Sequence, residues 1–214
     1  MSSDPDAPNI FDKAIFGKAI AEHLEVVRRM EAQAPVLEAI ATAMTAALRA
    51  GGKILWCGNG GSAADSQHLA AELVGRFRRE RRGLASIALT TDASVLTSVA
   101  NDYGFEAAFA RQVDAIGNAG DVLVGISTSG NSRNVIAALE TARAQGIVTV
   151  AFTGEGGGRI GAVADHVFAV DSRDTARIQE AHILAGHMLC DCIELASVSA
   201  PIRVDGAAKA EAAR

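Results

Sequence analysis

Five short apolar runs occur at intervals along the chain, and the segments between them have the spacing of amphipathic helices. The runs lie at about 53–58, 85–91, 121–127, 147–154 and 166–171. Helical spacing is found at about 62–79, 93–117 (broken around 101–104), 132–145 and 175–198. Continuous apolar strands that alternate with helices indicate a parallel sheet covered on both faces. The pattern predicts an α/β fold, built on a doubly wound five-stranded parallel sheet.

Two further helical stretches precede the first strand, at 10–32 and 34–50. Pro35 suits the first turn of the second helix, and Gly51-Gly52 ends it. We therefore expect a single domain over 10–200, with N-terminal helices at 10–50 and an α/β core and C-terminal helix at 51–200. We expect a disordered N-terminus at 1–9 and a frayed tail at 201–214.

The charge balance excludes some classes of partner. A net charge of −5 at pH 7 argues against a general binder of nucleic acid or of membrane surfaces. The N-terminus has no apolar leader, and we expect no membrane helix and a cytoplasmic protein. We interpret Cys57, Cys190 and Cys192 as buried free thiols rather than a disulfide or metal site. The basic cluster Arg76–Arg82 fits either a solvated helix end or a contact for an anion or a partner.

Two loops at the expected carboxyl ends of strands carry the residue types of a ligand site. One is Asn59-Gly60-Gly61-Ser62, and the other runs from Ser127 to Ser132. The second loop places four hydroxyls and a glycine at a helix start, where free N–H groups and the helix dipole favour an anion. It contains no lysine, so it is not a Walker-type nucleotide loop. A helix cap would need only one serine, and we interpret the loop as a site for the phosphate of a sugar phosphate.

A dinucleotide site is a competing explanation of the first loop. Gly58-x-Gly60-x-x-Ala63 fits the loose dinucleotide fingerprint, and Asp92 is the nearby carboxylate for a ribose. The motif is short and its match is weak. It also gives no reason for a histidine and a glutamate on the helix that follows.

That helix carries His68 and Glu72, four residues apart and therefore on one face. Such a pair can bind a metal ion or act as an acid and a base, and it also occurs as a plain surface hydrogen bond. The C-terminal helix adds three polar residues to an apolar stretch, at Gln179, His182 and His187.

Four segments together carry a specific resemblance: GNGGSAADSQHLAAEL, LTTDASVLTSVANDYGFE, GDVLVGISTSGNSRN and DTARIQEAHILAGH. In order and spacing, from about residue 10 to 195, the chain resembles the phosphoheptose isomerases of the SIS-domain superfamily, which have a flavodoxin-like fold. The resemblance implies conversion of sedoheptulose 7-phosphate to D-glycero-D-manno-heptose 7-phosphate, the entry step to activated heptoses. It also implies a zinc ion and a homotetramer.

Residue by residue, the resemblance implies both a metal set and a substrate set. The zinc ligands would be His68, Glu72, Gln179 and His187. The substrate contacts would be Asn59, Gly60, Gly61, Glu72, Asn101, Asp102, Ser127, Thr128, Ser129, Ser132 and Gln179. His182 is left over, and we interpret it as structural.

The chemistry of a ketose–aldose isomerase suits these residues. A proton moves between C1 and C2 through an enediol, which needs a base at carbon, an acid near O1 and O2, and stabilisation of oxyanion charge. We assign Glu72 as the carbon base and His187 as the acid and base at the oxygens, with zinc polarising the carbonyl. A zinc-bound carboxylate is a weaker base, so whether Glu72 is base, ligand or both stays open.

Two other functions are weighed against the isomerase. The superfamily includes non-catalytic regulators such as the DnaA initiator-associating proteins, and the IQEAH segment resembles those too. A pure binder has no reason to assemble His68, Glu72 and His187, which favours the enzyme. The third possibility, a nicotinamide-dependent oxidoreductase, rests on the dinucleotide fingerprint alone. The pathway that consumes the product is not encoded in these motifs.

The spacing on the C-terminal helix predicts a site between subunits. Gln179 and His187 are eight residues apart, about 12 Å along an ideal helix and about 80° around it. Zinc ligands must come within about 2.0–2.3 Å of one ion. We therefore expect one of the two to come from a neighbouring chain. The apolar helices at 10–50 and 175–198 exceed what one sheet needs as cover, which favours a helix-packed oligomer.

Overall fold

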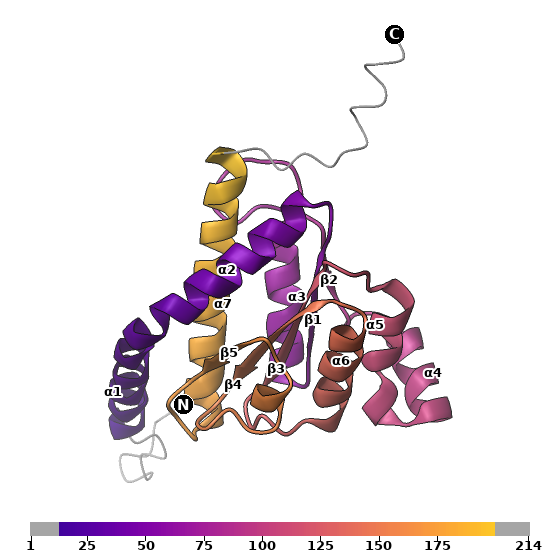
Figure 1. Ribbon diagram of the computed structural model, residues 1–214. Coiled ribbons are helices and arrows are strands. Elements are labelled where there is room, and N and C mark those ends of the chain that lie inside the picture. Colours follow the sequence, from indigo (N-terminus) through magenta and orange to yellow (C-terminus); the bar gives the residue numbers. More distant parts are fainter. Residues whose placement is uncertain (1–12, 200–214) are drawn as a thin grey trace, which may run out of the picture.

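The computed structural model describes residues 13–199, and it contains one sheet flanked by helices (Figure 1). The strands are β1 (Ile54–Gly58), β2 (Ser86–Ala88), β3 (Val122–Ser127), β4 (Val148–Thr153) and β5 (His166–Ala169). The helices are α1 (Lys13–Arg29), α2 (Ala34–Arg49), α3 (Gly61–Val74), α4 (Ala93–Tyr103), α5 (Ala110–Ile116), α6 (Arg133–Ala144) and α7 (Thr175–Ser199). Short 3-10 turns lie at Met30–Gln33, Phe105–Ala107 and Ile160–Ala162.

All five strands are parallel, in the order β2-β1-β3-β4-β5, which confirms the predicted fold class. Strand β2 is added on one side of β1, whereas β3, β4 and β5 follow on the other side, so the strand order reverses between β1 and β3. Gly58 at the end of β1 is paired with Ile126 near the end of β3. The loops that follow these two strands therefore lie side by side at the carboxyl edge, where doubly wound sheets bind ligands.

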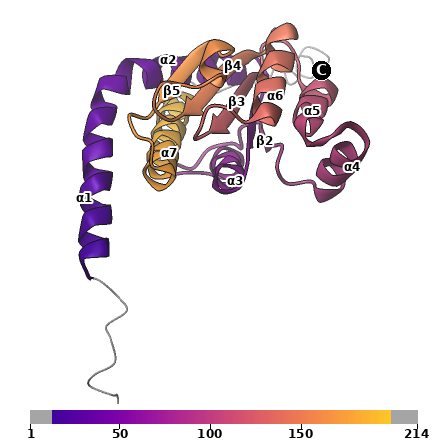
Figure 2. The same cartoon turned by 90° about the horizontal axis from the view of Figure 1, so that it is seen from below.

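Alternate residues of each strand feed two apolar cores. Trp56, Val124 and Phe152 belong to the core under α2, α3 and α7, whereas Leu55 and Leu123 belong to the core under α5 and α6. Figure 2 shows α3 and α7 on one face of the sheet and α6 on the other. Because both faces are covered, the strands carry apolar residues at consecutive positions, as the sequence pattern indicated.

Helices α1 and α4 lie at opposite ends of the molecule (Figure 2). Helix α1 extends beyond the sheet and leaves Ile15, Phe16 and Ile20 more than 60% exposed. It is joined to α7 by His23 Nδ1 and Glu180 Oε2, 2.8 Å apart. Helix α4 has no buried residue within the described part of the chain.

Helix α3 is shorter than the predicted 62–79. It ends at Val74, and a loop over 75–85 leads to β2. The guanidinium of Arg81 donates to the carbonyls of Glu72, Leu73 and Gly75, at 2.8, 2.9 and 3.0 Å. The loop thus provides the hydrogen bonds that a further helical turn would have made. The expected disordered N-terminus at 1–9 and frayed tail at 201–214 lie outside the described residues.

Helix α7 alone, among the described helices, is long and apolar enough to cross a membrane by length and composition. Half of its most apolar window is buried inside the fold. It contacts α2, α3 and α1, and its Ile178, Ala185 and Ile193 belong to the core. This burial is typical of a core helix, and the sequence pattern alone had not singled it out.

Candidate active site

The start of α3 depends on two glycines. Gly60 has a φ of 56°, a left-handed conformation that favours glycine. A Cβ on Gly61 would lie 2.5 Å from Nε2 of Gln179, so the Gln179 side chain lies directly against this helix start. The side chains of Asn59 and Asn134 exchange two amide hydrogen bonds of 2.9 and 2.8 Å. These contacts join the loop after β1 to α7 and α6.

Three candidate residues meet further along α3. His68 Nε2 lies 3.1 Å from Glu72 Oε1 and 3.4 Å from Nε2 of His187 on α7. One ligand atom from each residue lies within 4.8 Å of the other two. All three come from one chain. Imidazole nitrogens and a carboxylate at this spacing are suited to hold a metal ion such as Zn²⁺, and also to pass protons.

Gln179 lies apart from this cluster within the chain. It packs on Gly61, seven residues before His68 and so about 10 Å away along the axis of α3. The separation agrees with the argument from helix spacing that Gln179 and His187 do not share one ion within a single chain. Gln179 as a metal ligand stays a prediction.

His187 has an aromatic neighbour. The ring of Phe77 stacks on it, with centroids 5.2 Å apart and planes 18° apart. Burial is the main cause that lowers the pKa of His187, and the nearby His68 lowers it further. Glu72 acts in the opposite direction. A neutral imidazole keeps a lone pair for a metal ion or for a proton. The sequence reasoning missed Phe77, because a single aromatic residue in a basic loop matches no motif.

Asp65 is a second residue that the sequence reasoning passed over. It lies on the α3 stripe of Gly61, His68 and Glu72, with helical spacings of four, three and four residues. Its Oδ2 is buried and has no hydrogen-bond partner among the described residues. Burial raises the pKa of Asp65, and His68 opposes that change. The helical spacing with His68 and Glu72 is the signal that would have found it.

The loop after β3 is a cluster of hydroxyls. Ser127 Oγ lies 2.9 Å from Ser132 Oγ and 3.5 Å from Ser129 Oγ. Ser132 is the N-cap residue of α6, yet its side chain makes no capping hydrogen bond. The simple capping explanation therefore does not account for these hydroxyls. They lie at a helix N-terminus, the place where a helix binds anions, with Thr128 between them in the loop.

Glycines allow the loop after β4 to pack closely against the hydroxyl loop. Gly130 has a φ of 66°, and a Cβ there would lie 2.4 Å from the carbonyl oxygen of Gly157. The backbone of Gly154 donates to the carbonyl of Thr128 at 3.0 Å. The loop after β4 thereby fixes the position of the hydroxyl loop.

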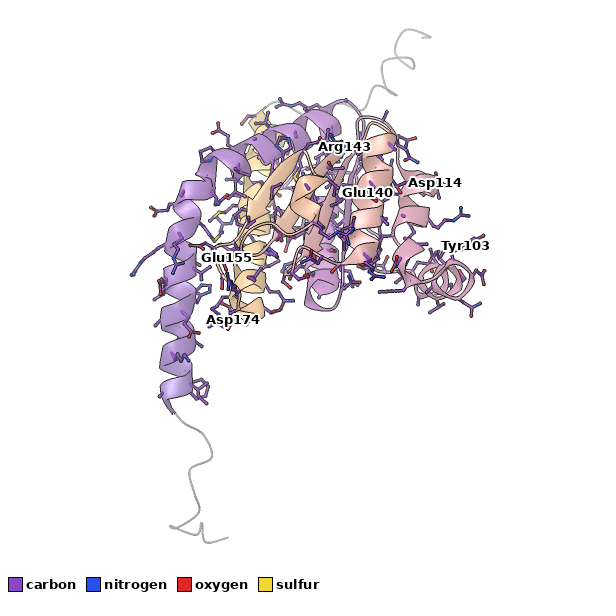
Figure 3. The ribbon with its side chains drawn as sticks, turned by 60° about the horizontal axis from the view of Figure 1, so that its bottom comes forward. Tyr103, Asp114, Glu140, Arg143, Glu155 and Asp174 are labelled. Carbon is purple, nitrogen blue, oxygen red and sulfur yellow. The ribbon has the colours of Figure 1, made fainter. Side chains whose placement is uncertain are left out.

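Asn101 and Asp102 are not joined to the other candidates in the described part of the chain. Asn101 Nδ2 donates to Asp102 Oδ1 at 2.8 Å, and both residues are exposed at the end of α4. Figure 3 labels their neighbour Tyr103 at the outer end of this helix. The two expected substrate contacts therefore lie on a helix that is itself uncovered.

The dinucleotide interpretation finds no support. The carboxylate of Asp92, which would have to hold a ribose, accepts a hydrogen bond of 3.0 Å from the backbone of Val95 and caps α4. A Cβ on Gly58 would lie 2.8 Å from that of Ser62, so this glycine is explained by close packing. Cys57 and Cys190 are buried, as expected, and burial raises the pKa of each thiol to about 12. The expectation was wrong for Cys192, which is exposed on α7.

His182 is a core residue, in agreement with the structural role assigned to it. It is fully buried beside Phe152 and Phe168, and its Nε2 donates to the carbonyl of Thr153 at 3.1 Å. Burial lowers the pKa of His182 to about 4, from the ordinary 6.5.

This shift predicts a loss of stability in acid. The unfolded chain takes up the proton as the pH falls below about 6.5, and the folded chain only near pH 4, so the contribution is complete above 6.5 and is lost on the way to 4. The loss amounts to about 3 kcal/mol at about 1.36 kcal/mol per pKa unit. Urea unfolding between pH 7.5 and 4 measures it. We expect His182→Gln to show a flatter profile than the parent chain, and equal slopes would contradict the assignment.

Comparisons with known proteins identify the family of this chain. The SIS-domain pattern matches residues 16–154. A phosphoheptose isomerase of a Roseiflexus species is 55% identical over 176 residues, which is 82% of this chain and 89% of that protein. The solved phosphoheptose isomerase of Neisseria gonorrhoeae is 47% identical with a TM-score of 0.80, covering 85% of this chain and 98% of that one. The solved phosphoheptose isomerase of Francisella tularensis is 40% identical, with a TM-score of 0.77. This match covers 85% of this chain and 95% of that one.

Identity at this level extends across most of both chains. The range matched by the SIS-domain family includes the loops after β1 and β3, which carry candidate residues. The fold, the motifs and the relatives agree: the chain belongs to the phosphoheptose isomerase family of SIS-domain proteins.

Proposed function

We propose that this chain is an isomerase that converts sedoheptulose 7-phosphate to D-glycero-D-manno-heptose 7-phosphate through an enediol, the first step of activated-heptose biosynthesis. The observation that carries the proposal is the cluster of His68, Glu72 and His187 in a chain of this family. The test is an NMR assay of the purified protein with sedoheptulose 7-phosphate. Signals of the heptose aldose are expected, and their absence with zinc supplied would contradict the proposal.

The roles follow from the positions of the two groups. Glu72 is half-buried on α3 and takes the proton from C1 or C2 and returns it to the neighbouring carbon. His187, whose pKa is lowered by burial and by the nearby His68, exchanges protons with O1 and O2. These two residues lie on facing helices and their ligand atoms are within 4.8 Å of each other, so a carbon chain bound beside the cluster meets the base and the acid together.

The donor set fits a zinc ion. His68 and His187 face each other through Nε2, and Glu72 adds a carboxylate oxygen, which makes three protein ligands from one chain. Gln179 of a neighbouring chain is the proposed fourth ligand. When bound, zinc supplies Lewis-acid stabilisation of the negative charge that develops on the substrate oxygens.

The phosphate is assigned to the loop after β3, where Ser127, Thr128, Ser129 and Ser132 surround the N-terminus of α6. Asn59, Gly60 and Gly61 border the sugar from the loop after β1. Asn101 and Asp102 are assigned to the far side of the substrate.

Ser129→Ala is expected to weaken substrate binding and leave turnover nearly unchanged. A hydrogen bond to a charged phosphate contributes roughly 1.5–3 kcal/mol, which corresponds to a rise in KM of about 10- to 150-fold. The NMR assay gives KM and kcat separately. Inhibition by inorganic phosphate should weaken by a similar factor, because it lacks the sugar but uses the same loop. A fall in kcat with unchanged KM would contradict the phosphate assignment.

We further propose a cytoplasmic homotetramer with the site between subunits. The exposed apolar side chains of α1, together with Tyr103 and Phe105 around the end of α4, support this assembly, because a monomer would leave them in water. The net charge gives no reason to add nucleic acid or a membrane as partners. A non-catalytic regulator is not favoured, because such a protein does not need the cluster of His68, Glu72 and His187.

A further inference from the structure

A buried carboxylate lies seven residues after His187 on α7. Glu194 is fully buried, and its two oxygens accept hydrogen bonds of 2.8 Å from the backbone N–H groups of Phe77, Arg78 and Arg79. The carboxylate lies 3.2 Å from Nε of Arg81, whose side chain is only 4% exposed. Burial tends to raise the pKa of Glu194, but these N–H groups and Arg81 hold it below its ordinary value. A buried charge with so many partners is costly to remove.

The segment that Glu194 holds is the basic cluster Arg76–Arg82, for which the sequence left two interpretations open. Asp191, one turn before Glu194, pairs with the guanidinium groups of Arg78 and Arg79. Arg81 donates to the last carbonyls of α3, the helix that carries His68 and Glu72. Contacts with α7 therefore hold Arg78, Arg79 and Arg81 of this cluster, whereas Arg76 and Arg82 are exposed to solvent.

The contacts between α7 and this loop determine the position of the Phe77 ring. Phe77 stacks on His187, and the guanidinium of Arg78 lies 5.1 Å from the centre of the Phe77 ring. We propose that Glu194 is a positioning residue for the isomerase reaction: through the backbone of residues 77–79 it places Phe77 against His187, and Phe77 fixes the orientation of the His187 ring toward His68. Side chains in active sites need such support, because a loosely held group loses its geometry.

The inference rests on the proposed function only for its effect on catalysis. An acid–base group that can rotate spends less time facing the substrate oxygens, so kcat should fall. The phosphate contacts lie on the loop after β3, which Glu194 does not touch among the described contacts, so KM should change little. Misplacement by about 1 Å lowers rates by up to about 100-fold.

The test uses the metal-free protein with isotope-labelled histidine. In Phe77→Leu, the NMR resonances of the His187 ring should shift, because the ring current of the stacked Phe77 is lost. Glu194→Asp keeps the charge opposite Arg81 but shortens the side chain, so it should move the same resonances in the same direction. Both variants should lower kcat by about 10- to 100-fold with KM within about threefold.

Phe77→Tyr keeps a stacked ring and should retain both the resonances and kcat. Arg82→Ala removes an exposed cation of the same loop and serves as the control. If folded Glu194→Asp leaves the His187 resonances and kcat unchanged, the proposal is overturned. If that variant does not fold, Glu194→Gln takes its place, and unchanged resonances and kcat in Phe77→Leu overturn the proposal in either case. The resonances need no substrate, so a chain without isomerase activity would refute the proposed function and leave this test valid.

Discussion

Replacing Glu72 with glutamine is expected to lower turnover by about two to four orders of magnitude, because an amide cannot take the proton from the substrate carbon. The substitution keeps the size and shape of a side chain that is 23% exposed, so the fold should persist. Substrate binding should persist as well, since the phosphate is held by a different loop. The NMR assay gives the rate, and titration with substrate gives the affinity.

A matched control for this variant is Glu140→Gln. Glu140 is exposed on α6, on the face of the sheet opposite α3, and Figure 3 labels it there. The Glu140→Gln substitution makes the same chemical change far from the cluster, so it should leave the isomerisation rate unaltered. A Glu72→Gln enzyme with a rate near that of the parent chain would show that another group is the base. Asp65 is the other carboxyl on the same stripe of α3, and its Oδ2 has no hydrogen-bond partner among the described residues.

Much of the fold could be predicted because its determinants are local. A strand buried on both faces must be a continuous apolar run, and each such run became a strand within a few residues of its predicted bounds. The pair His68 and Glu72 could be placed on one helix face from spacing alone. His187 joins them as the family resemblance implied.

What could not be predicted depends on contacts between distant segments. The end of α3 is set by Arg81, eight residues beyond Leu73, whose guanidinium replaces the next helical turn. The partner of that arginine, Glu194, lies more than a hundred residues further on. Nothing near Glu194 in the sequence distinguishes it from a solvated glutamate on an amphipathic helix. The separation of Gln179 from the cluster was anticipated only because helix geometry sets a fixed rise per residue.

These positions decide which residues different chains must contribute. His68, Glu72 and His187 already meet within one chain, so mixing Glu72→Gln with His187→Ala subunits cannot create an intact cluster. Asn101 and Asp102 are different, because they lie on α4, which buries none of its residues in its own chain. If the expected substrate contacts on α4 serve the site of a neighbouring subunit, a variant of the cluster and a variant of α4 should complement each other.

The final prediction is therefore a pair of mixing experiments under conditions that exchange subunits. Asp102→Ala alone should lose most activity, as Glu72→Gln does. After random exchange of these two variants in equal amounts, about a quarter of two-chain sites would combine an intact cluster with an intact α4, and activity should return to about that fraction.

The mixture of Glu72→Gln with His187→Ala is the control and should stay at the level of the separate variants. Exchange is verified by native mass spectrometry of subunits with different isotope labels. Failure of the first mixture despite exchange would place α4 in the site of its own chain. Activity in the control mixture would mean that α3 and α7 of different chains form the cluster, contrary to the contact of His68 with His187 within one chain.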